Sequence, residues 1–298
     1  MTAPLVPGSP EWCRVVTASK VAAILGHSPF ESQRSIWHSM RGEYTPTTTA
    51  AMERGNYLEA GVLQWWRDQH PEFPVTREQP QWRLGEWAAA TPDMLAGPKG
   101  CTSKKLTGAV LVEAKTSADD REWGDPGTDQ IPAHYLTQCF WSMHLSGIHE
   151  IRVPVLTSRL VFVEYVVRHD PEIGRLLVER CRTFYDTLTA AVPPPLDDTL
   201  STFECMRALH PDIEDGLAVE VSRDLALSFL TAARDKTDAE ARERFARSQL
   251  LDLAGHAQYL TCQGIRIAAR ERKGAGVSLV RKAKSPDQIP TTEQETAA

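Results

Sequence analysis

Long apolar runs are missing from this 298-residue sequence. Nothing in it approaches the ~20 consecutive apolar residues of a membrane-spanning helix, and its first residues lack the basic and apolar regions of a secretory signal. With 42% hydrophobic and 24% charged residues, the composition is that of a globular protein with a sizeable core. We therefore expect a cytoplasmic protein that has no membrane partner.

Cysteine is scarce, and the motifs of several enzyme classes are absent. No two of the six cysteines have the C-x-x-C spacing of a zinc or redox site, which predicts reduced structural thiols. The nine histidines include no His-x-x-x-His pair, and there is no Walker loop, Gly-rich dinucleotide turn or Ser/His/Asp order. These absences argue against a zinc hydrolase, and they exclude the motifs of nucleotide-binding and serine-hydrolase enzymes from this sequence.

An excess of positive charge is also lacking. The net charge is -6 and the pI about 5.9, so the chain as a whole does not attract a polyanion. One segment differs, because residues 266–284 contain Glu271 as their only acid. Its basic residues are Arg266, Arg270, Arg272, Lys273, Arg281, Lys282 and Lys284. Binding to a phosphate backbone and a merely soluble ribbon explain this segment equally well.

A short apolar stretch with two charged residues stands out in what remains. Residues 110–115 read Val-Leu-Val-Glu-Ala-Lys, which predicts a buried strand. Because side chains alternate along a strand, Glu113 and Lys115 should share one face, with Val112 and Ala114 on the other. A carboxylate and an ammonium group are costly to desolvate unless they hold a metal, a phosphate or each other. We therefore predict a site on this face.

A second acid precedes this strand by twenty residues. Pro92 keeps Thr91 extended, so Asp93 is expected at a strand end. The order acid, spacer, acid-x-Lys is the pattern of the PD-(D/E)xK nucleases. A short acid-x-Lys also arises by chance in many chains, so the surrounding motifs must decide.

Helical periodicity supplies further candidate residues. Helices are predicted over residues 11–26, 32–40, 49–69, 131–145 and 172–191. In the first of them, Arg14, Thr17, Ser19 and Lys20 cluster near a helix start, which suits a phosphate as well as plain capping. Glu59 lies near the apolar face of the third helix, where it either reaches solvent or points into a site.

Strands and domain limits complete the outline. Strands are predicted over residues 75–77, 81–84, 87–90, 151–156 and 160–168, the last two as a hairpin. After the proline run at 193–195, two helices over 225–233 and 239–254 are expected to form a helical hairpin, followed by paired strands over 265–270 and 277–281. The predicted divisions are an arm (1–10), a core (11–192), a linker (193–197), a helical and basic region (198–284) and a disordered tail (285–298).

Together these pieces resemble the YqaJ-like viral recombinase or phage lambda exonuclease family of the PD-(D/E)xK nucleases. The resemblance covers roughly residues 11–190 and rests on five motifs in the family's order. They read Thr17-Ala18-Ser19, Gly55-Asn56-Tyr57-Leu58-Glu59, Thr91-Pro92-Asp93, Val112-Glu113-Ala114-Lys115 and Tyr135-x-x-Gln138. The implied fold is an α/β restriction-endonuclease-like core, a central mixed sheet flanked by helices, with a C-terminal helical hairpin and basic strands added.

The resemblance also implies a metal site. Asp93, Glu113 and the Ala114 carbonyl would bind Mg²⁺, for which Mn²⁺ would substitute, with Glu59 nearby as a second acidic group. Lys115 would orient or activate the attacking water. Beside a metal ion, its pKa is expected to be lowered, so that it could accept a proton.

The remaining matched residues are assigned to the substrate. Gln138 would help to position the water or the DNA, and it lies with Tyr135 on a polar stripe of the helix predicted over 131–145. Arg14, Thr17 and Ser19 would recognise a 5′ phosphate, with Tyr135 also on the DNA side.

The implied activity is Mg²⁺-dependent 5′ to 3′ digestion of linear double-stranded DNA, in a bacterial host cell if a phage or prophage encodes the chain. Implied partners are duplex DNA ends, a single-strand annealing recombination protein and further copies of the chain in a ring. An endonuclease of the restriction or repair kind is an alternative. A non-catalytic DNA-binding or scaffold protein with a degenerate nuclease fold is another. The absent C-x-x-C argues against an iron-sulfur nuclease.

Overall fold

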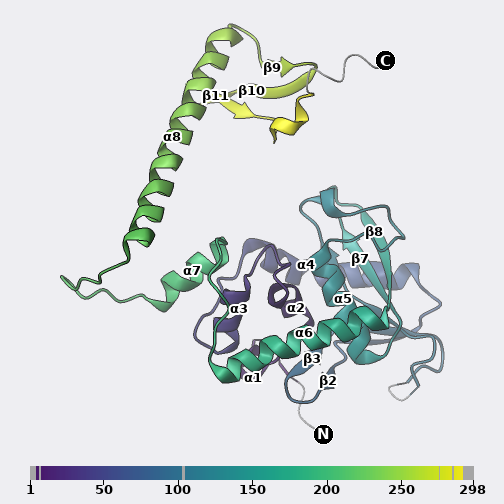
Figure 1. Cartoon of the computed structure of the whole chain (residues 1–298). Coiled ribbons are helices and arrows are strands. Elements are labelled where there is room, and N and C mark those ends of the chain that lie inside the picture. Colours follow the sequence, from purple (N-terminus) through teal and green to yellow (C-terminus); the bar gives the residue numbers. More distant parts are fainter. Residues whose placement is uncertain (1–4, 7, 103–104, 275, 284, 291–298) are drawn as a thin grey trace. The chain divides into compact units, whose positions relative to one another are not determined.

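The computed structural model describes residues 5–6, 8–102, 105–274, 276–283 and 285–290 (Figure 1). Two compact units are present, Met1–Ile213 and Glu214–Ala298, and each is considered by itself. Parts of the predicted arm, residues 1–4 and 7, and most of the predicted tail, residues 291–298, lie outside the described residues. No helix in the described part of the chain is long and apolar enough to cross a membrane.

The larger unit is built on a six-stranded mixed sheet of order β1-β4-β5-β7-β6, with β8 also paired to β7. Its strands are β1 (Val75–Glu78), β4 (Met94–Gly97), β5 (Val110–Val112), β6 (Lys115–Thr116), β7 (Glu150–Leu156) and β8 (Phe162–Arg168). Both β5 and β6 run parallel to β7, whereas the other pairs are antiparallel. A separate ribbon joins β2 (Trp82–Leu84) to β3 (Ala88–Ala90). The predicted central mixed sheet and the β7–β8 hairpin are confirmed.

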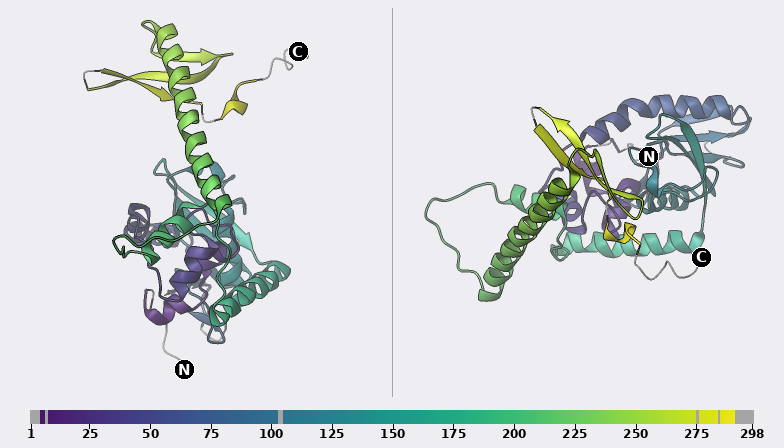
Figure 2. Two further views of the ribbon diagram at one scale, coloured as in Figure 1. Left: turned by 60° about the vertical axis from the view of Figure 1, so that its left-hand side comes forward. Right: turned by 90° about the horizontal axis from the view of Figure 1, so that it is seen from above.

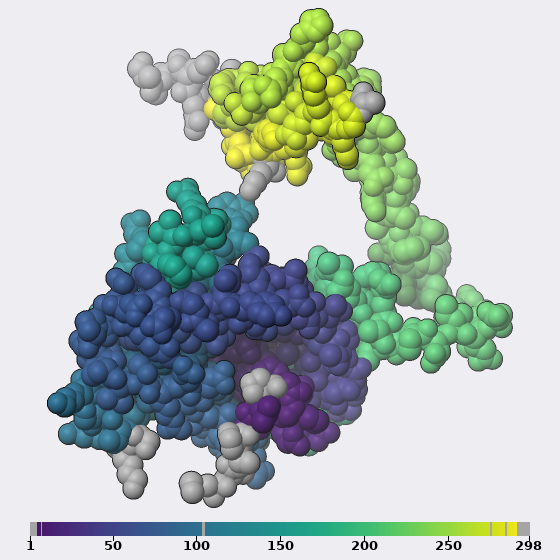
Figure 3. All heavy atoms as spheres, turned by 180° about the vertical axis from the view of Figure 1, so that it is seen from behind, coloured from purple at the N-terminus to yellow at the C-terminus, as the bar shows by residue number. Residues whose placement is uncertain are grey.

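Helices cover both faces of this sheet. Leu95 and Leu111 point to the face that packs against α2, α3, α5 and α6, and Met94 and Val112 point to the opposite face, against α4. The helices are α1 (Pro10–Arg14), α2 (Ala18–Ile24), α3 (Gln33–Met40), α4 (Ala50–Gln69), α5 (Ala133–Ser146) and α6 (Pro171–Ala190). In Figure 2, seen from above, α4 and α6 lie on opposite sides of the larger unit, and α4 faces the viewer in Figure 3. The sheet is therefore buried on both faces.

Local signals at the helix ends agree with the predictions. Ser32 caps α3 and Thr49 caps α4 through side-chain oxygens, and Gly147 ends α5 in a left-handed conformation at φ 71°. The helix signal over 11–26 is divided, however. Val16 is extended and bridges to Ala88, so α1 and α2 are separate helices.

The larger unit continues beyond the predicted linker at 193–197. Helix α7 (Leu200–Leu209) packs against α3, and the Thr202 hydroxyl donates to Ser32 Oγ at 2.7 Å. The compact unit therefore ends at Ile213 and not at the proline run. Proline stops a helix without separating domains when the next helix returns to the same core, which corrects the predicted boundary.

The smaller unit contains one long helix and a three-stranded antiparallel sheet. The predicted helical hairpin is wrong, because α8 is continuous over Arg223–Ala254. The expected break at 236–238 contains neither Gly nor Pro, and Lys236 pairs with Glu240 one turn on, at 3.9 Å. The predicted pairing of the basic strands is confirmed. The sheet has the order β11-β10-β9 and comprises β9 (Tyr259–Cys262), which was not predicted, β10 (Ile265–Lys273) and β11 (Gly276–Arg281). All six cysteines are free thiols, as expected.

Candidate active site

The candidate site lies where β5 ends. Glu113 directly follows this strand, and its backbone N–H donates to the carbonyl of Arg152 on β7 at 2.9 Å. Lys115 opens β6, which also pairs with β7. The chain thus stays extended through both residues, and Lys115 Nζ donates to Glu113 Oε1 at 2.7 Å. The predicted common face of these two side chains is confirmed.

Glu113 is buried, with 3% of its surface exposed, and its two carboxylate oxygens differ. Oε1 accepts hydrogen bonds from Lys115 and from the side-chain amide of Gln138 on α5. Oε2 is buried and has no hydrogen-bond partner in the structure. Leaving a buried carboxylate oxygen unpaired is costly, so its position indicates a ligand that the protein alone does not provide.

Asp93 is brought to Glu113 by strand pairing. It directly precedes β4, whose Met94 lies opposite Val112 on β5, and its Oδ2 accepts from the Ala114 N–H at 2.8 Å. Burial and the Glu113 carboxylate raise the pKa of Asp93 well above its usual value, against the opposing effect of Lys115. Negative charge is therefore concentrated at this point.

Glu59 on α4 belongs to the same electrostatic neighbourhood. Its pKa is raised, first by burial and then by the charge of Glu113, while Lys115 opposes the shift. Among the described residues, no three His, Cys, Asp or Glu side chains form a group that could hold a metal ion. The predicted second acidic group is therefore near the site without completing a three-carboxylate cage.

The expected lowering of the Lys115 pKa depends on a bound metal ion, and the chain alone has the opposite effect. Burial lowers the pKa of Lys115, but the charges of Glu113 and Asp93 outweigh burial, and its pKa is raised above the usual value. Its ammonium group also lies 5.0 Å from the centre of the Tyr135 ring. Lys115 is thus a cation held by carboxylates, and it could accept a proton only where another positive charge compensated them.

A divalent cation suits these donors. Asp93 and Glu113 supply hard carboxylate oxygens, one of them a buried atom without a partner, and Mg²⁺ is typically bound by one or two carboxylates and water. The cation would also relieve the repulsion that raises the pKa of Asp93.

The residues predicted to bind a 5′ phosphate are brought together only in part. Arg14 and Ser19 are exposed, and the hydroxyl of buried Thr17 lies 3.2 Å from that of Ser19. Helix α2, which carries Ser19, packs against α5, which carries Tyr135 and Gln138. The structure therefore places these elements side by side.

Lys20 has a different role from its neighbours in the sequence. It is 5% exposed, and its Nζ donates to the carbonyls of Trp12, Cys13 and Val15 at 2.8, 2.8 and 2.7 Å. Burial lowers the pKa of Lys20 to about 8, and the charges of Cys13 and Glu31 raise it only in part. Its ammonium group is used at the C-terminal end of α1, so it is not available to a phosphate.

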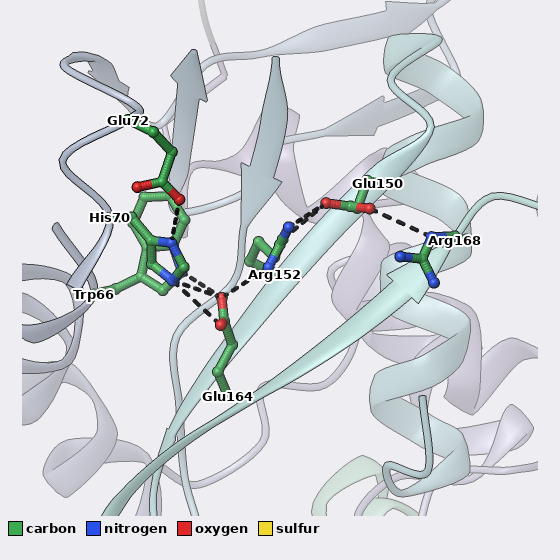
Figure 4. Close-up of polar contacts among 7 residues, drawn as sticks. All are labelled: Trp66, His70, Glu72, Glu150, Arg152, Glu164 and Arg168. Atoms are coloured by element: carbon green, nitrogen blue, oxygen red, sulfur yellow. Dashed lines mark hydrogen bonds and ion pairs between the residues drawn. The ribbon is translucent and has the colours of Figure 1, made fainter. Parts of the chain in front are cut away.

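A second polar cluster, on the α4 side of the sheet, was not predicted (Figure 4). We call it the paired cluster, and it consists of Trp66, His70, Glu72, Glu150, Arg152, Glu164 and Arg168. Glu164 accepts from Trp66 Nε1 at 2.7 Å and contacts His70 Nε2 at 3.2 Å. Arg152 lies 3.7 Å from Glu164 and 2.7 Å from Glu150. The signal in the sequence was Arg152 within the strand predicted over 151–156, with Glu150 immediately before that strand.

A family model matches residues 12–149, and its description is the YqaJ-like viral recombinase domain. This range contains Glu59, Asp93, Glu113, Lys115 and Gln138. No curated protein matches the chain.

Several solved structures are similar to part of the chain. An alkaline exonuclease from Laribacter hongkongensis shares 18% identity, over 60% of this chain and 90% of that one, with a TM-score of 0.45. The same enzyme in complex with dAMP gives 18% identity, 61% and 90% coverage and a TM-score of 0.43. A phage-related exonuclease from Haemophilus somnus gives 15% identity, 59% and 96% coverage and a TM-score of 0.44.

Proposed function

We propose that the chain, which matches the model of the YqaJ-like viral recombinase domain over residues 12–149, is a Mg²⁺-dependent exonuclease that digests linear double-stranded DNA from 5′ ends. Mn²⁺ would replace Mg²⁺. The remaining single strands would pass to an annealing recombination protein, and copies of the chain could assemble around the DNA. The observation that carries the proposal is the buried, unpartnered Oε2 of Glu113 beside Asp93 and Lys115.

The carboxylates of Asp93 and Glu113 and the Ala114 carbonyl would hold the cation. When bound, Mg²⁺ supplies positive charge that makes a water molecule more acidic and neutralises charge gathering on the phosphoryl oxygens. Asp93 is kept in place by the Ala114 N–H, and Glu113 by Lys115 and Gln138. Preorganised ligands of this kind avoid reorganisation during the reaction.

Lys115 and Gln138 would act on the water and the scissile phosphate. Both already donate to Glu113 Oε1, so their remaining N–H groups can donate to an oxygen placed next to it. Lys115 would orient the attacking water as an ammonium donor, and only a Lys115 kept neutral by the charge of a bound cation could accept the proton of that water. Tyr135 limits where the ammonium group can move.

Recognition of the 5′ end is assigned to Arg14, Thr17 and Ser19. The two hydroxyls lie 3.2 Å apart at the start of α2, where free backbone N–H groups also favour an anion. Arg14 is exposed and adds a positive charge nearby in sequence. A 5′ phosphate bound here would select DNA ends.

The test is digestion of end-labelled linear duplex DNA, with a 5′ phosphate or a 5′ hydroxyl, with and without Mg²⁺. Closed circular DNA of the same sequence serves as the second substrate. We expect loss of the linear DNA only, in the presence of Mg²⁺, and faster with the 5′ phosphate. Lys115→Ala should abolish the loss, whereas Lys236→Ala, an exposed lysine on α8, should not.

Each alternative predicts a different result in this experiment. Cutting of the circle as fast as the linear DNA would support an endonuclease of the restriction or repair kind. No cutting of either substrate, together with no Mg²⁺ or Mn²⁺ uptake by calorimetry, would support a non-catalytic DNA-binding protein.

A further inference from the structure

The sheet of the smaller unit concentrates positive charge in a chain whose net charge is -6. Six of its Arg and Lys residues are described, against one acid, Glu271, between residues 266 and 282. They are Arg266, Arg270, Arg272, Lys273, Arg281 and Lys282. Contacts within the unit account for only some of them.

Two of these six have partners that explain them. Arg270 donates to the backbone carbonyls of Gly255 and Ala257, just beyond the C-terminal end of α8, where a positive charge is favourable. Lys282 pairs with Glu271 across the β10–β11 ladder at 2.6 Å. Both therefore stabilise the unit.

The other four cations are exposed, and none has an ion-pair partner among the described residues: Arg266, Arg272, Lys273 and Arg281. Arg266 and Lys273 stand near the two ends of β10, about 23 Å apart at the rise of a strand. The register of the ladders places Arg266 and Lys273 on the face of Tyr259, and Arg272 and Arg281 on the opposite face. Like charges along one face repel each other unless a partner neutralises them. A polyanion of matching length is such a partner, because it releases counterions on binding.

An aromatic ring lies at one end of this row. Tyr259 on β9 is 43% exposed, and the Arg266 guanidinium lies 3.7 Å from the centre of its ring. Arginine stacked on a tyrosine holds the ring at the surface, where a second planar group can stack on it. Stacking on aromatic rings beside a basic track is how proteins bind strands whose bases are unpaired.

We propose that the β9–β10–β11 sheet binds single-stranded DNA on the face of Tyr259, with Arg266 and Lys273 on phosphates and Tyr259 against a base. The choice of DNA rests on the proposed function, but the surface uses no residue of the candidate active site. A single strand fits better than a duplex, because bases inside a duplex are not free to stack on Tyr259.

The test measures, by fluorescence anisotropy, the binding of a labelled oligothymidine of about thirty nucleotides. Binding is measured in EDTA at several KCl concentrations. All proteins are full-length and carry Lys115→Ala, so that digestion cannot interfere. Adding Arg266→Ala and Lys273→Ala should weaken binding at low salt by about tenfold or more. These two changes should also reduce the slope of log K against log salt by about 1.4, since each phosphate contact on a single strand contributes about 0.7.

The matched control removes the two cations of the opposite face instead. Arg272 and Arg281 are exposed, and no ion pair joins them to described residues. The variant Arg272→Ala with Arg281→Ala has the same net charge as the test variant, and it should retain both affinity and salt slope. Equal weakening by the two double variants would overturn the proposal, as would unchanged binding by the variant that lacks Arg266 and Lys273.

Tyr259 provides a readout that bulk charge does not move. Tyr259→Ala should weaken binding by about tenfold at an unchanged salt slope, and Tyr259→Phe should restore it. Thermal unfolding of each variant shows whether the sheet is intact. A preference for duplex over single strand would contradict the assignment. Digestion by the chain with an intact Lys115 is measured separately, so a chain that binds but does not cut refutes the nuclease alone.

Discussion

Two polar clusters lie on opposite faces of the same sheet, and they are built from similar residues. The site cluster consists of Asp93, Glu113, Lys115 and Gln138, and the paired cluster of Figure 4 joins acids to Arg, His and Trp. In the site cluster, the buried Oε2 of Glu113 has no partner. In the paired cluster, Glu164 uses one oxygen for Trp66 and the other for His70.

We interpret this difference as one between a cluster arranged to receive a cation and a cluster that stabilises the fold. A fully satisfied polar network rigidifies the fold, whereas a buried group left without a partner destabilises it. Glu113 has such an unpaired oxygen at the end of a core strand, and burial, together with the charge of Glu113, raises the pKa of Asp93 beside it. The two clusters contain similar residue types. They differ in whether the buried carboxylate oxygens have hydrogen-bond partners.

The largest expected effect is on the rate of DNA digestion, which should fall in variants of the site cluster and not in a variant of the paired cluster. Lys115→Ala and Glu113→Gln should each reduce Mg²⁺-dependent digestion of linear duplex DNA by about 10²- to 10⁴-fold. Lys115→Ala should also lower the melting temperature, because it leaves the buried Glu113 and Asp93 without their cation, whereas Glu113→Gln removes one of two crowded acids and should lower it less. Glu164→Gln should keep the rate within about twofold of the unmodified chain. Comparable losses of rate in Glu164→Gln and Glu113→Gln would remove the distinction.

A second prediction compares the two buried lysines of the larger unit, because Lys20 donates to backbone carbonyls whereas Lys115 donates to a carboxylate. Burial lowers the pKa of Lys20 in the folded chain from 10.5 to about 8. The neutral form is thus favoured by folding, and the free energy of unfolding should rise between about pH 8 and 10.5, by up to about 3 kcal/mol. Below that range, Lys20 is charged in both states and contributes no slope.

Urea unfolding at pH 7.5 and pH 10 measures this effect. The difference between the unmodified chain and Lys20→Met isolates Lys20, since other titrating groups cancel. The unmodified chain should gain stability relative to the variant as the pH rises. An equal pH dependence in both proteins would show that Lys20 is not desolvated. Lys115 should give no such gain, because its pKa is raised.

A third prediction uses the unpartnered oxygen directly. Mg²⁺ at a hundred times its dissociation constant should increase the free energy of unfolding by about 2.7 kcal/mol, since it binds the folded state only. The increase should vanish in Asp93→Asn and Glu113→Gln and persist in Glu164→Gln. Denaturation with and without Mg²⁺ tests it, and an undiminished gain in Glu113→Gln would place the cation elsewhere.

The smallest expected effect is on the stability of the paired cluster. Glu164→Gln should lower the free energy of unfolding by about 1 to 2 kcal/mol, because Arg152 and His70 lose their shared carboxylate. Removing one partner of a fully buried pair costs more, but Glu164 and Arg152 are about one-fifth exposed. Glu179→Gln breaks an exposed pair with Arg175 and should cost less than about 0.5 kcal/mol. Equal losses in the two variants would show that the cluster adds no stability.

Several features of the fold could be predicted because they depend on neighbours in the chain. Caps at Ser32 and Thr49, the turn at Gly147 and the alternation of Glu113 and Lys115 follow from local geometry. The predicted break within α8 failed for a related reason. Polar residues near 236–238 suggested a turn, but a helix accepts them where charges one turn apart can pair.

The paired cluster and the role of Lys20 could not be predicted from local pattern. Glu164 meets Trp66 and His70 only because the β7–β8 hairpin lies under α4. Lys20 reaches three carbonyls only because the chain between α1 and α2 is extended against β3. A lysine beside Ser19 in sequence gives no sign of this burial.

The sequence by itself determined that an acid and a lysine share one face at the end of a core strand, since the two-residue period of a strand is a property of the backbone. It also determined the order of the motifs that bring Asp93 and Gln138 into consideration. Only the tertiary structure decided that Gln138, on a helix 25 residues further along the chain, donates to one oxygen of Glu113 and leaves the other unpaired. Burial and unmet hydrogen bonds arise from packing between distant segments, and no local pattern contains them.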